Sequence, residues 1–64
     1  MQVILPDKST RTLPGNTRTI ENLLSELGIR SSGVIVARNG VLVSEDAVAG
    51  GDDQVRIIRV AHGG

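Results

Sequence analysis

The chain contains no cysteine and no aromatic residue, and its seven basic residues balance seven acidic ones. Without cysteine there is no disulfide, no thiolate zinc site and no redox pair. Without Phe, Tyr or Trp there is no ring on which nucleic-acid bases could stack, and a net charge of zero gives no electrostatic footprint for a phosphate backbone. The lone histidine, His62, cannot hold a metal by itself. These absences argue against a disulfide scaffold, a metalloprotein and a nucleic-acid-binding protein.

No apolar run is long enough to cross a membrane, and no signal peptide is visible. A chain of 64 residues makes one domain near the lower limit of independent folding, too small for a deep active-site cleft. No nucleophile is paired with a base, since there is neither a cysteine nor a second histidine. We therefore expect a small soluble cytoplasmic protein that has no membrane or nucleic-acid partner, binds no cofactor and is not an enzyme.

Apolar residues make up 39% of the chain, and they are all aliphatic apart from one methionine. A domain this small has little stability to spare, so nearly every Val, Ile and Leu is expected to be buried. An exposed aliphatic side chain would therefore indicate a partner.

One helix is clearly indicated in the middle of the chain. Apolar residues recur at helical spacing, at Ile20, Leu23, Leu24 and Leu27. Thr19 is expected to cap the N-terminus, where Glu21 suits the helix dipole. Gly28 is expected to end the helix in a left-handed conformation, with Ile29 packing back as in a Schellman motif.

Short strands are predicted on both sides of this helix, over residues 1–5, 10–13, 34–38, 41–43 and 54–60. The first two are joined by a turn over 6–9, in which the Asp7 side chain can bond the backbone two residues on. Asn39-Gly40 is a strong signal for a tight hairpin. Residues 44–49 fit either a single helical turn or an irregular crossover.

This order predicts an α+β fold, a mixed sheet of four or five strands wrapped around one helix, with the first and last strands parallel at its centre. We expect one domain over residues 1–60 and a flexible tail over 61–64.

The tail ends in Gly63-Gly64. Such an ending can be no more than a frayed terminus. Two residues without Cβ are also the thinnest backbone for entering the active site of another protein. A carboxylate becomes an acyl donor only after activation, for example as a mixed anhydride with AMP.

The strand order, the Asn39-Gly40 hairpin, the segment 50–60 and the terminal diglycine together resemble the ThiS/MoaD sulfur-carrier family of ubiquitin-like β-grasp proteins. The opening residues 1–5 and the segment 19–24 are also similar to ThiS, and the resemblance covers essentially the whole chain. MoaD proteins are usually longer, so ThiS is the nearer of the two.

The resemblance implies that an E1-like enzyme adenylates Gly64 with ATP and that a sulfur donor then converts it to a thiocarboxylate, while Gly63 helps to thread the tail. The sulfur would go to an accepting enzyme of thiamine thiazole synthesis, tRNA thiolation or molybdopterin synthesis. An alternative with the same terminus is a ubiquitin-like modifier joined to lysines of target proteins. An alternative from another class is a plain protein-interaction module.

The last strand suggests where a partner docks. If Val55 and Ile57 face the core, alternation turns Ile58 and Val60 outward. Ile58 occupies a position that belongs to an exposed docking patch in ubiquitin-like proteins. We expect Ile58, Val60, Arg59 and His62 to contact the activating enzyme. The opposing interpretation is that Ile58 and Val60 are covered and that Arg59 and His62 are merely solvated.

Overall fold

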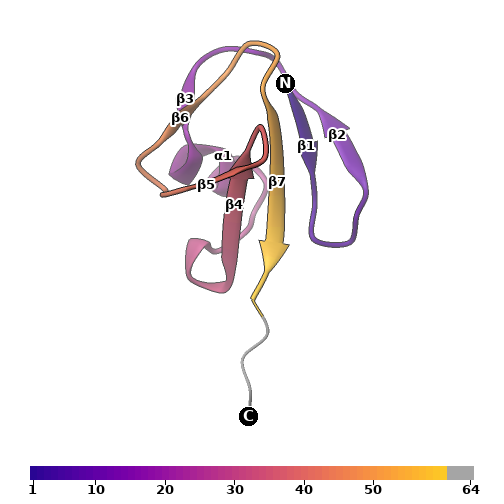
Figure 1. Cartoon of the computed structure of the whole chain (residues 1–64), viewed down its shortest axis with the longest axis vertical. Helices are drawn as coiled ribbons and strands as arrows, with labels where there is room; N and C mark the ends of the chain where they lie inside the picture. Colours follow the sequence, from indigo (N-terminus) through magenta and orange to yellow (C-terminus); the bar gives the residue numbers. More distant parts are fainter. Residues whose placement is uncertain (61–64) are drawn as a thin grey trace.

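A computed structural model of the chain describes residues 1–60. They form a five-stranded sheet in the order β2-β1-β7-β4-β5, and one α-helix packs against one face of it (Figure 1). The strands of this sheet are β1 (Gln2–Ile4), β2 (Thr10–Thr12), β4 (Val34–Arg38), β5 (Val41–Val43) and β7 (Gln54–Arg59). The helix is α1 (Ile20–Glu26). This is the α+β arrangement that the sequence predicts.

The first and last strands lie side by side at the centre of the sheet. β1 pairs with β7 in parallel, with Val3 opposite Val55, and every other pair in the sheet is antiparallel. The predicted central parallel pair is therefore confirmed. Its consequence is that β7 pairs with β1 over residues 54–56 and with β4 over residues 55–59, so β4 alone pairs with it where the chain leaves the domain.

The helix begins and ends as its sequence predicts. Thr19 caps it, because the Thr19 hydroxyl oxygen accepts a hydrogen bond of 3.1 Å from the backbone N–H of Asn22. Gly28 has a φ of +72°, which glycine adopts without steric cost. The backbone N–H of Gly28 donates to Ser25 and that of Ile29 to Leu24, the bond pair of a Schellman motif.

The tight hairpin between β4 and β5 is also confirmed. Asn39 and Gly40 have φ values of +51° and +84°, as a type I′ turn requires at both central positions. The turn between β1 and β2 contains the predicted side-chain bond, since the backbone N–H of Ser9 donates to Asp7 Oδ1 at 2.9 Å.

Three short elements were not predicted. β3 (Arg18–Thr19) and β6 (Val48–Ala49) pair as a second, two-stranded sheet, and a 3-10 helix, η1, spans Ser31–Gly33. Residues 44–49 therefore form the crossover rather than a helical turn. The crossover also completes the start of α1, because the backbone N–H groups of Ile20 and Glu21 donate to its carbonyls. Those N–H groups have no acceptor within the helix itself.

The core lies between the helix and the inner face of the sheet. Its least exposed large side chains, all below 2% exposure, are Ile20, Leu23, Ile57, Val3 and Val55. Val55 and Ile57 thus face inward, as alternation along the last strand predicts.

The expectation that nearly every aliphatic side chain is buried is wrong for six residues: Ile35, Val41, Leu42, Val48, Ile58 and Val60. For Ile35, Leu42 and Ile58 the physical reason is that a single helix covers only one face of the five-stranded sheet, so outward positions on β4, β5 and β7 have no second layer above them. Within residues 1–60, no helix is both long and apolar enough to cross a membrane.

Candidate functional site

The central strand β7 carries the chain to its C-terminal residues. Beyond Arg59, the backbone N–H of Val60 donates to the carbonyl of Gly33 at 3.0 Å, which ties the end of the strand to η1. His62, Gly63 and Gly64 lie outside the described residues, so their predicted roles stay predictions. Residues 61–64 follow Val60, which comes directly after a strand that pairs with both β1 and β4.

The outer face of β7 is open, and it is apolar near the C-terminal end of the strand. Ile58 and Val60 are each 38% exposed, and neither lies beneath the helix. Ile58 stands opposite Ile35 of β4, which is 44% exposed. Two exposed isoleucines on adjacent strands therefore make a continuous aliphatic surface beside the start of the tail.

Two members of this surface, Ile35 and Leu42, were missed by the sequence analysis. Val36 lies opposite Ile57 and is buried, so alternation turns its neighbours Ile35 and Ala37 outward. Leu42 of β5 stands opposite Ala37 on the same face. The signal was present in the alternation, but it required the register between β4 and β7.

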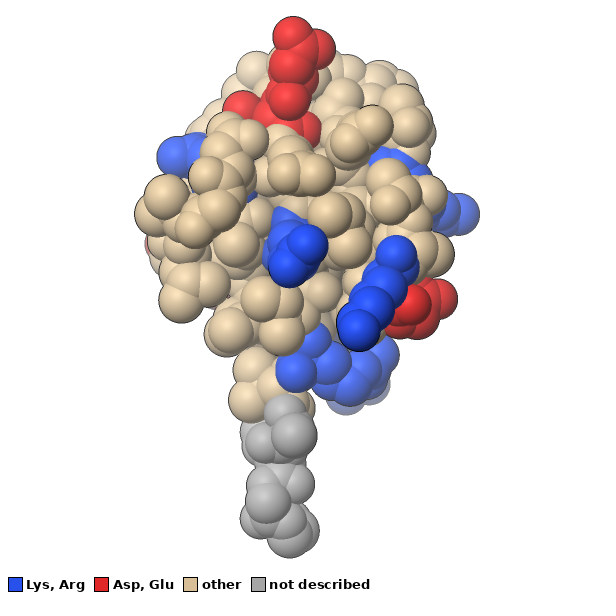
Figure 2. Space-filling model, turned by 45° about the vertical axis from the view of Figure 1, so that its right-hand side comes forward, with Lys and Arg blue, Asp and Glu red and all other residues tan. Residues whose placement is uncertain are grey.

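A groove of about 620 Å³ lies between the β1–β2 hairpin and the outer side of β7. Its apolar part is formed by Ile4, Leu5, Pro6, Ile57 and Ile58, and its polar part by Lys8, Thr10, Arg56 and Arg59. Three of these nine lining residues are cationic and none is acidic. On the face in Figure 2, basic side chains lie at both upper edges, in the middle and, most densely, at the lower end of the described surface, while acidic side chains lie at the top and at the right.

Arg59, predicted as a docking residue, is exposed and lines three neighbouring grooves. It lines the groove described above, a second one beside Arg11 and Leu27, and a third one beside Arg30. The linings of these three grooves hold four further basic residues, Lys8, Arg11, Arg30 and Arg56, and one acidic residue, Asp7.

The tip of the β1–β2 hairpin holds Lys8 in an unusual backbone conformation. Lys8 has a φ of +72°, in the left-handed region that disfavours side chains with a Cβ. The turn that imposes it is closed by the Lys8 N–H donating to the Leu5 carbonyl and the Leu5 N–H donating to the Ser9 carbonyl, both at 2.8 Å. The Ser9 hydroxyl and backbone N–H also bond Asp7, and these hydrogen bonds lower the pKa of the Asp7 carboxyl.

A polar cluster at the opposite end of β7 serves the fold. Asp53 accepts hydrogen bonds of 3.0 Å from the Asn39 amide and from the Gly50 backbone N–H, and the first of these is the main cause of its lowered pKa. Both donors belong to turns, so this aspartate joins two turns together. Among residues 1–60, no three His, Cys, Asp or Glu side chains are placed to hold a metal ion.

The candidate site of the described residues is an exposed surface along β7. The aliphatic surface, the basic groove and the exit of the chain all lie along β7. Such an arrangement can present a C-terminus to another protein.

Comparisons with known proteins agree with this architecture. The crystal structure of a thiamine biosynthesis protein (ThiS) from Geobacter metallireducens matches with a TM-score of 0.70 and 26% sequence identity, over 100% of both chains. No curated protein sequence matches this chain. The model of the ThiS family matches residues 3–64. The chain therefore belongs to the ThiS family, and the match supports a sulfur-carrier role for it.

Proposed function

We propose that this chain carries sulfur on its C-terminal carbonyl, as a thiocarboxylate of Gly64. The observation that carries the proposal is the family match, which runs through residue 64 and so includes the diglycine. The position of the last strand also supports the proposal, because the residues that lead to Gly64 follow β7, which is paired with β4 up to Arg59.

The proposed chemistry has two steps, both performed in the active site of an ATP-dependent activating enzyme. The Gly64 carboxylate attacks the α-phosphorus of ATP, pyrophosphate leaves, and an acyl-adenylate forms. Hydrosulfide or an equivalent donor then attacks the Gly64 carbonyl carbon. AMP leaves with one of the original carboxylate oxygens, a proton is released, and the sulfur remains on the carbonyl.

The absence of cysteine fits this role. The only sulfur atom in the chain is that of Met1, which is buried at 8% exposure. A carrier without a thiol must hold its transferable sulfur elsewhere, and an acyl carbon at a free terminus is suited to receive it.

The activating enzyme is proposed to dock on the exposed surface of β7. Ile58, Val60 and Arg59 are all accessible to it, and His62 and Gly63 follow on the path to its active site. We infer a cytoplasmic location, because activation consumes ATP. The matched structure is of a thiamine biosynthesis protein, which favours a thiazole-forming enzyme as the sulfur acceptor over enzymes of tRNA thiolation or molybdopterin synthesis.

The test is intact-mass spectrometry after incubation with ATP, the host's activating enzyme and hydrosulfide. The proposal predicts a mass increase equal to the difference between sulfur and oxygen. Adducts on lysines of other proteins, without this change, would instead indicate a ubiquitin-like modifier. If neither product forms, and deletion of Gly63 and Gly64 leaves cellular function intact, the chain is an interaction module and the proposal is wrong.

A further inference from the structure

The tight turn between β4 and β5 contains a pair of residues that is chemically labile in proteins. In an Asn-Gly pair, the backbone nitrogen of the glycine can attack the side-chain amide carbon of the asparagine, because no Cβ on the glycine obstructs the approach. Asn39-Gly40 is the only such pair in the chain. Both residues are exposed, so water reaches them.

In the folded chain the side-chain amide of Asn39 is held at both ends. Its Nδ2 donates to Asp53 Oδ1 at 3.0 Å, and its Oδ1 accepts a hydrogen bond of 2.9 Å from the backbone N–H of Gln54. The backbone N–H of Asn39 also donates to the Gln54 carbonyl at 2.7 Å. A side chain held in this way cannot rotate freely about its Cα–Cβ bond, so its amide carbon cannot move freely toward the Gly40 nitrogen.

Asp53, which holds the Asn39 amide, is itself fixed from its other side. Its Oδ2 accepts a hydrogen bond of 3.0 Å from the backbone N–H of Gly50, and its own backbone N–H donates to the Gly50 carbonyl at 3.1 Å. The bond from Asn39 is the main cause of the lowered pKa of Asp53, so the Asn39 amide faces an ionised carboxylate at neutral pH. This position accepts a hydrogen-bond donor and is unfavourable for a second carboxylate.

We infer that Asn39 is a deamidation site, and that its two side-chain hydrogen bonds to the start of β7 protect it in the folded chain. In the reaction the Gly40 nitrogen forms a bond to the amide carbon of Asn39, its proton leaves with the amide nitrogen as ammonia, and a five-membered succinimide results. Water then opens this ring at one of its two carbonyls and leaves aspartate or isoaspartate at position 39. The inference goes beyond the proposed function and does not depend on it.

Either product breaks the junction between the turn and β7. Aspartate at position 39 has no proton to donate to Asp53, and it places two carboxylates where the structure has one hydrogen bond. Isoaspartate adds a carbon atom to the main chain of a turn whose geometry is fixed by its two central residues. A chain that opens at this turn and reacts therefore cannot close in the same way, so deamidation makes the opening irreversible.

The rate of deamidation at neutral pH tests the protection. Peptide mass spectrometry measures it, because the amide NH2 is replaced by OH at position 39. Asp53→Ala leaves Asn39 and Gly40 in place but removes one of the two holding bonds, and it should speed the reaction about tenfold, as expected for a lost hydrogen bond to a charged group. In concentrated urea, where the bonds are absent in both chains, the two rates should be equal.

The matched control for Asp53→Ala is Thr19→Ala. It also removes one side-chain hydrogen bond and lowers stability, but at the start of α1. Its rate should stay within about twofold of the wild-type rate, because local opening of the turn does not depend on the helix cap. Equal acceleration by Thr19→Ala and Asp53→Ala would show that the reaction occurs in the globally unfolded chain, and would overturn the inference.

An exchange of the two side chains tests the damage. Asn39→Asp makes one product directly, and its urea midpoint should fall. Asp53→Asn should also lower the midpoint, since two amides cannot satisfy the N–H groups of both Gly50 and Gln54 together with each other. In the double variant all three bonds can form again with the carboxylate on the other residue, so it should recover much of the summed loss. Asn22→Asp adds the same charge in the first turn of α1, where an acidic residue is favourable, and should not lower the midpoint.

Three results would contradict the inference. The first is a wild-type chain that deamidates as fast folded as in concentrated urea. The second is an Asn39→Asp chain with the urea midpoint of the wild type. The third is a double variant that loses as much stability as the two single variants together. None of these measurements involves the activating enzyme, so their outcome is independent of the proposed sulfur chemistry.

Discussion

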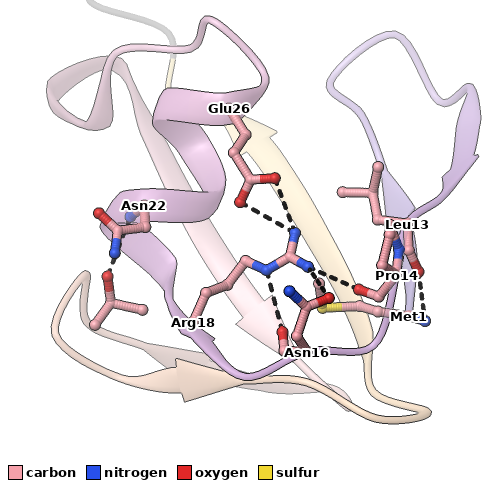
Figure 3. A network of polar contacts seen from close by, with 8 residues as sticks. Met1, Leu13, Pro14, Asn16, Arg18, Asn22 and Glu26 are labelled. Carbon is pink, nitrogen blue, oxygen red and sulfur yellow. Dashed lines mark hydrogen bonds and ion pairs between the residues drawn. The ribbon is translucent and has the colours of Figure 1, made fainter.

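Arg18 donates to both carboxylate oxygens of Glu26, at 3.0 Å each, and so ties the segment before α1 to the last turn of the helix (Figure 3). The same guanidinium donates to the carbonyls of Pro14 and Asn16 and to the Asn16 side chain. The Arg18 side chain is 10% exposed and that of Glu26 is 52% exposed. Loss of the Arg18 side chain would therefore leave two backbone carbonyls without their donor, whereas loss of Glu26 would remove only a half-exposed ion pair.

This asymmetry predicts different costs for the two partners. Arg18→Ala should lower the free energy of unfolding by about 2 kcal/mol, because two carbonyls lose their donor. Glu26→Ala should cost less than about 1 kcal/mol, since a half-exposed carboxylate is well solvated. Urea unfolding followed by circular dichroism measures both, with the exposed Arg11→Ala as a control. Equal costs for Arg18→Ala and Glu26→Ala would contradict this interpretation.

A close approach of two backbone segments predicts that Gly15 cannot be replaced. A Cβ at Gly15 would lie 2.9 Å from the Gly51 carbonyl oxygen, and the Gly51 N–H already donates to the Gly15 carbonyl at 2.6 Å. Gly15→Ala should therefore cost about 1–3 kcal/mol in the free energy of unfolding.

The matched control for that substitution is Gly33→Ala. A Cβ at Gly33 has no heavy atom of the described residues within 4 Å, and its φ is not positive. Its urea midpoint should stay close to that of the wild type. Similar midpoints for the two variants would show that the approach at Gly15 is not tight in solution.

The hydrogen bonds to Asp53 predict a loss of stability in acid. They lower its pKa in the folded protein below the ordinary value of 3.8. The folded protein therefore stabilises the ionised carboxylate more than the unfolded chain does. The stabilisation is therefore complete above that value and is lost as the pH falls through the folded-state pKa. Asp53→Asn should lower the free energy of unfolding at neutral pH and reduce the further loss between neutral pH and about pH 2.5.

Asp52→Asn is the natural comparison for Asp53→Asn. Asp52 is exposed next to it in the same turn, and its side chain makes no hydrogen bond to another residue of the described part. Asp52→Asn should leave the free energy of unfolding at neutral pH close to the wild-type value. If Asp53→Asn loses as much stability in acid as the wild type does, the bonds to Asn39 and Gly50 do not act as described.

The exposed Ile58 predicts a defect in activation with only a modest effect on folding. Ile58→Ala should raise the KM for adenylation about five- to tenfold in a pyrophosphate-exchange assay with the host's activating enzyme, because an apolar contact is removed from the proposed interface. Val48→Ala removes a similarly exposed side chain from β6, away from β7, and should leave the KM unchanged. A larger increase of the KM in Val48→Ala than in Ile58→Ala would indicate that the docking surface does not lie on β7.

The elements that could be predicted from the sequence are those whose signals are local. The helix caps at Thr19 and Gly28 and the Asn39-Gly40 turn depend on residues a few positions apart, and all were confirmed. The outward position of Ile58 followed from alternation along a single strand. What could not be predicted depends on distant pairing. β3 and β6 are two residues each, too short for a pattern, and Ile35 joins Ile58 only through the register of β4 with β7.

The candidate groove illustrates the same limit. The sequence analysis assigned no role to Lys8 or Arg56, because nothing local indicates that a hairpin tip lies against the central strand. Parallel pairing of β1 with β7, which joins the two ends of the chain, creates the groove. The charge balance of the whole chain concealed a local excess of cations.

The central claim is that sulfur is carried on Gly64, and fragmentation mass spectrometry of the C-terminal peptide measures it most directly. The chain is incubated with ATP, the host's activating enzyme and hydrosulfide, and a chain lacking Gly64 is treated in parallel. Since there is no cysteine, added sulfur has no thiol on which to form a persulfide. The account predicts one oxygen replaced by sulfur at Gly64 in the full chain and no change in the shortened one. An unmodified Gly64 in the presence of the active enzyme, or sulfur located elsewhere in the chain, would contradict it.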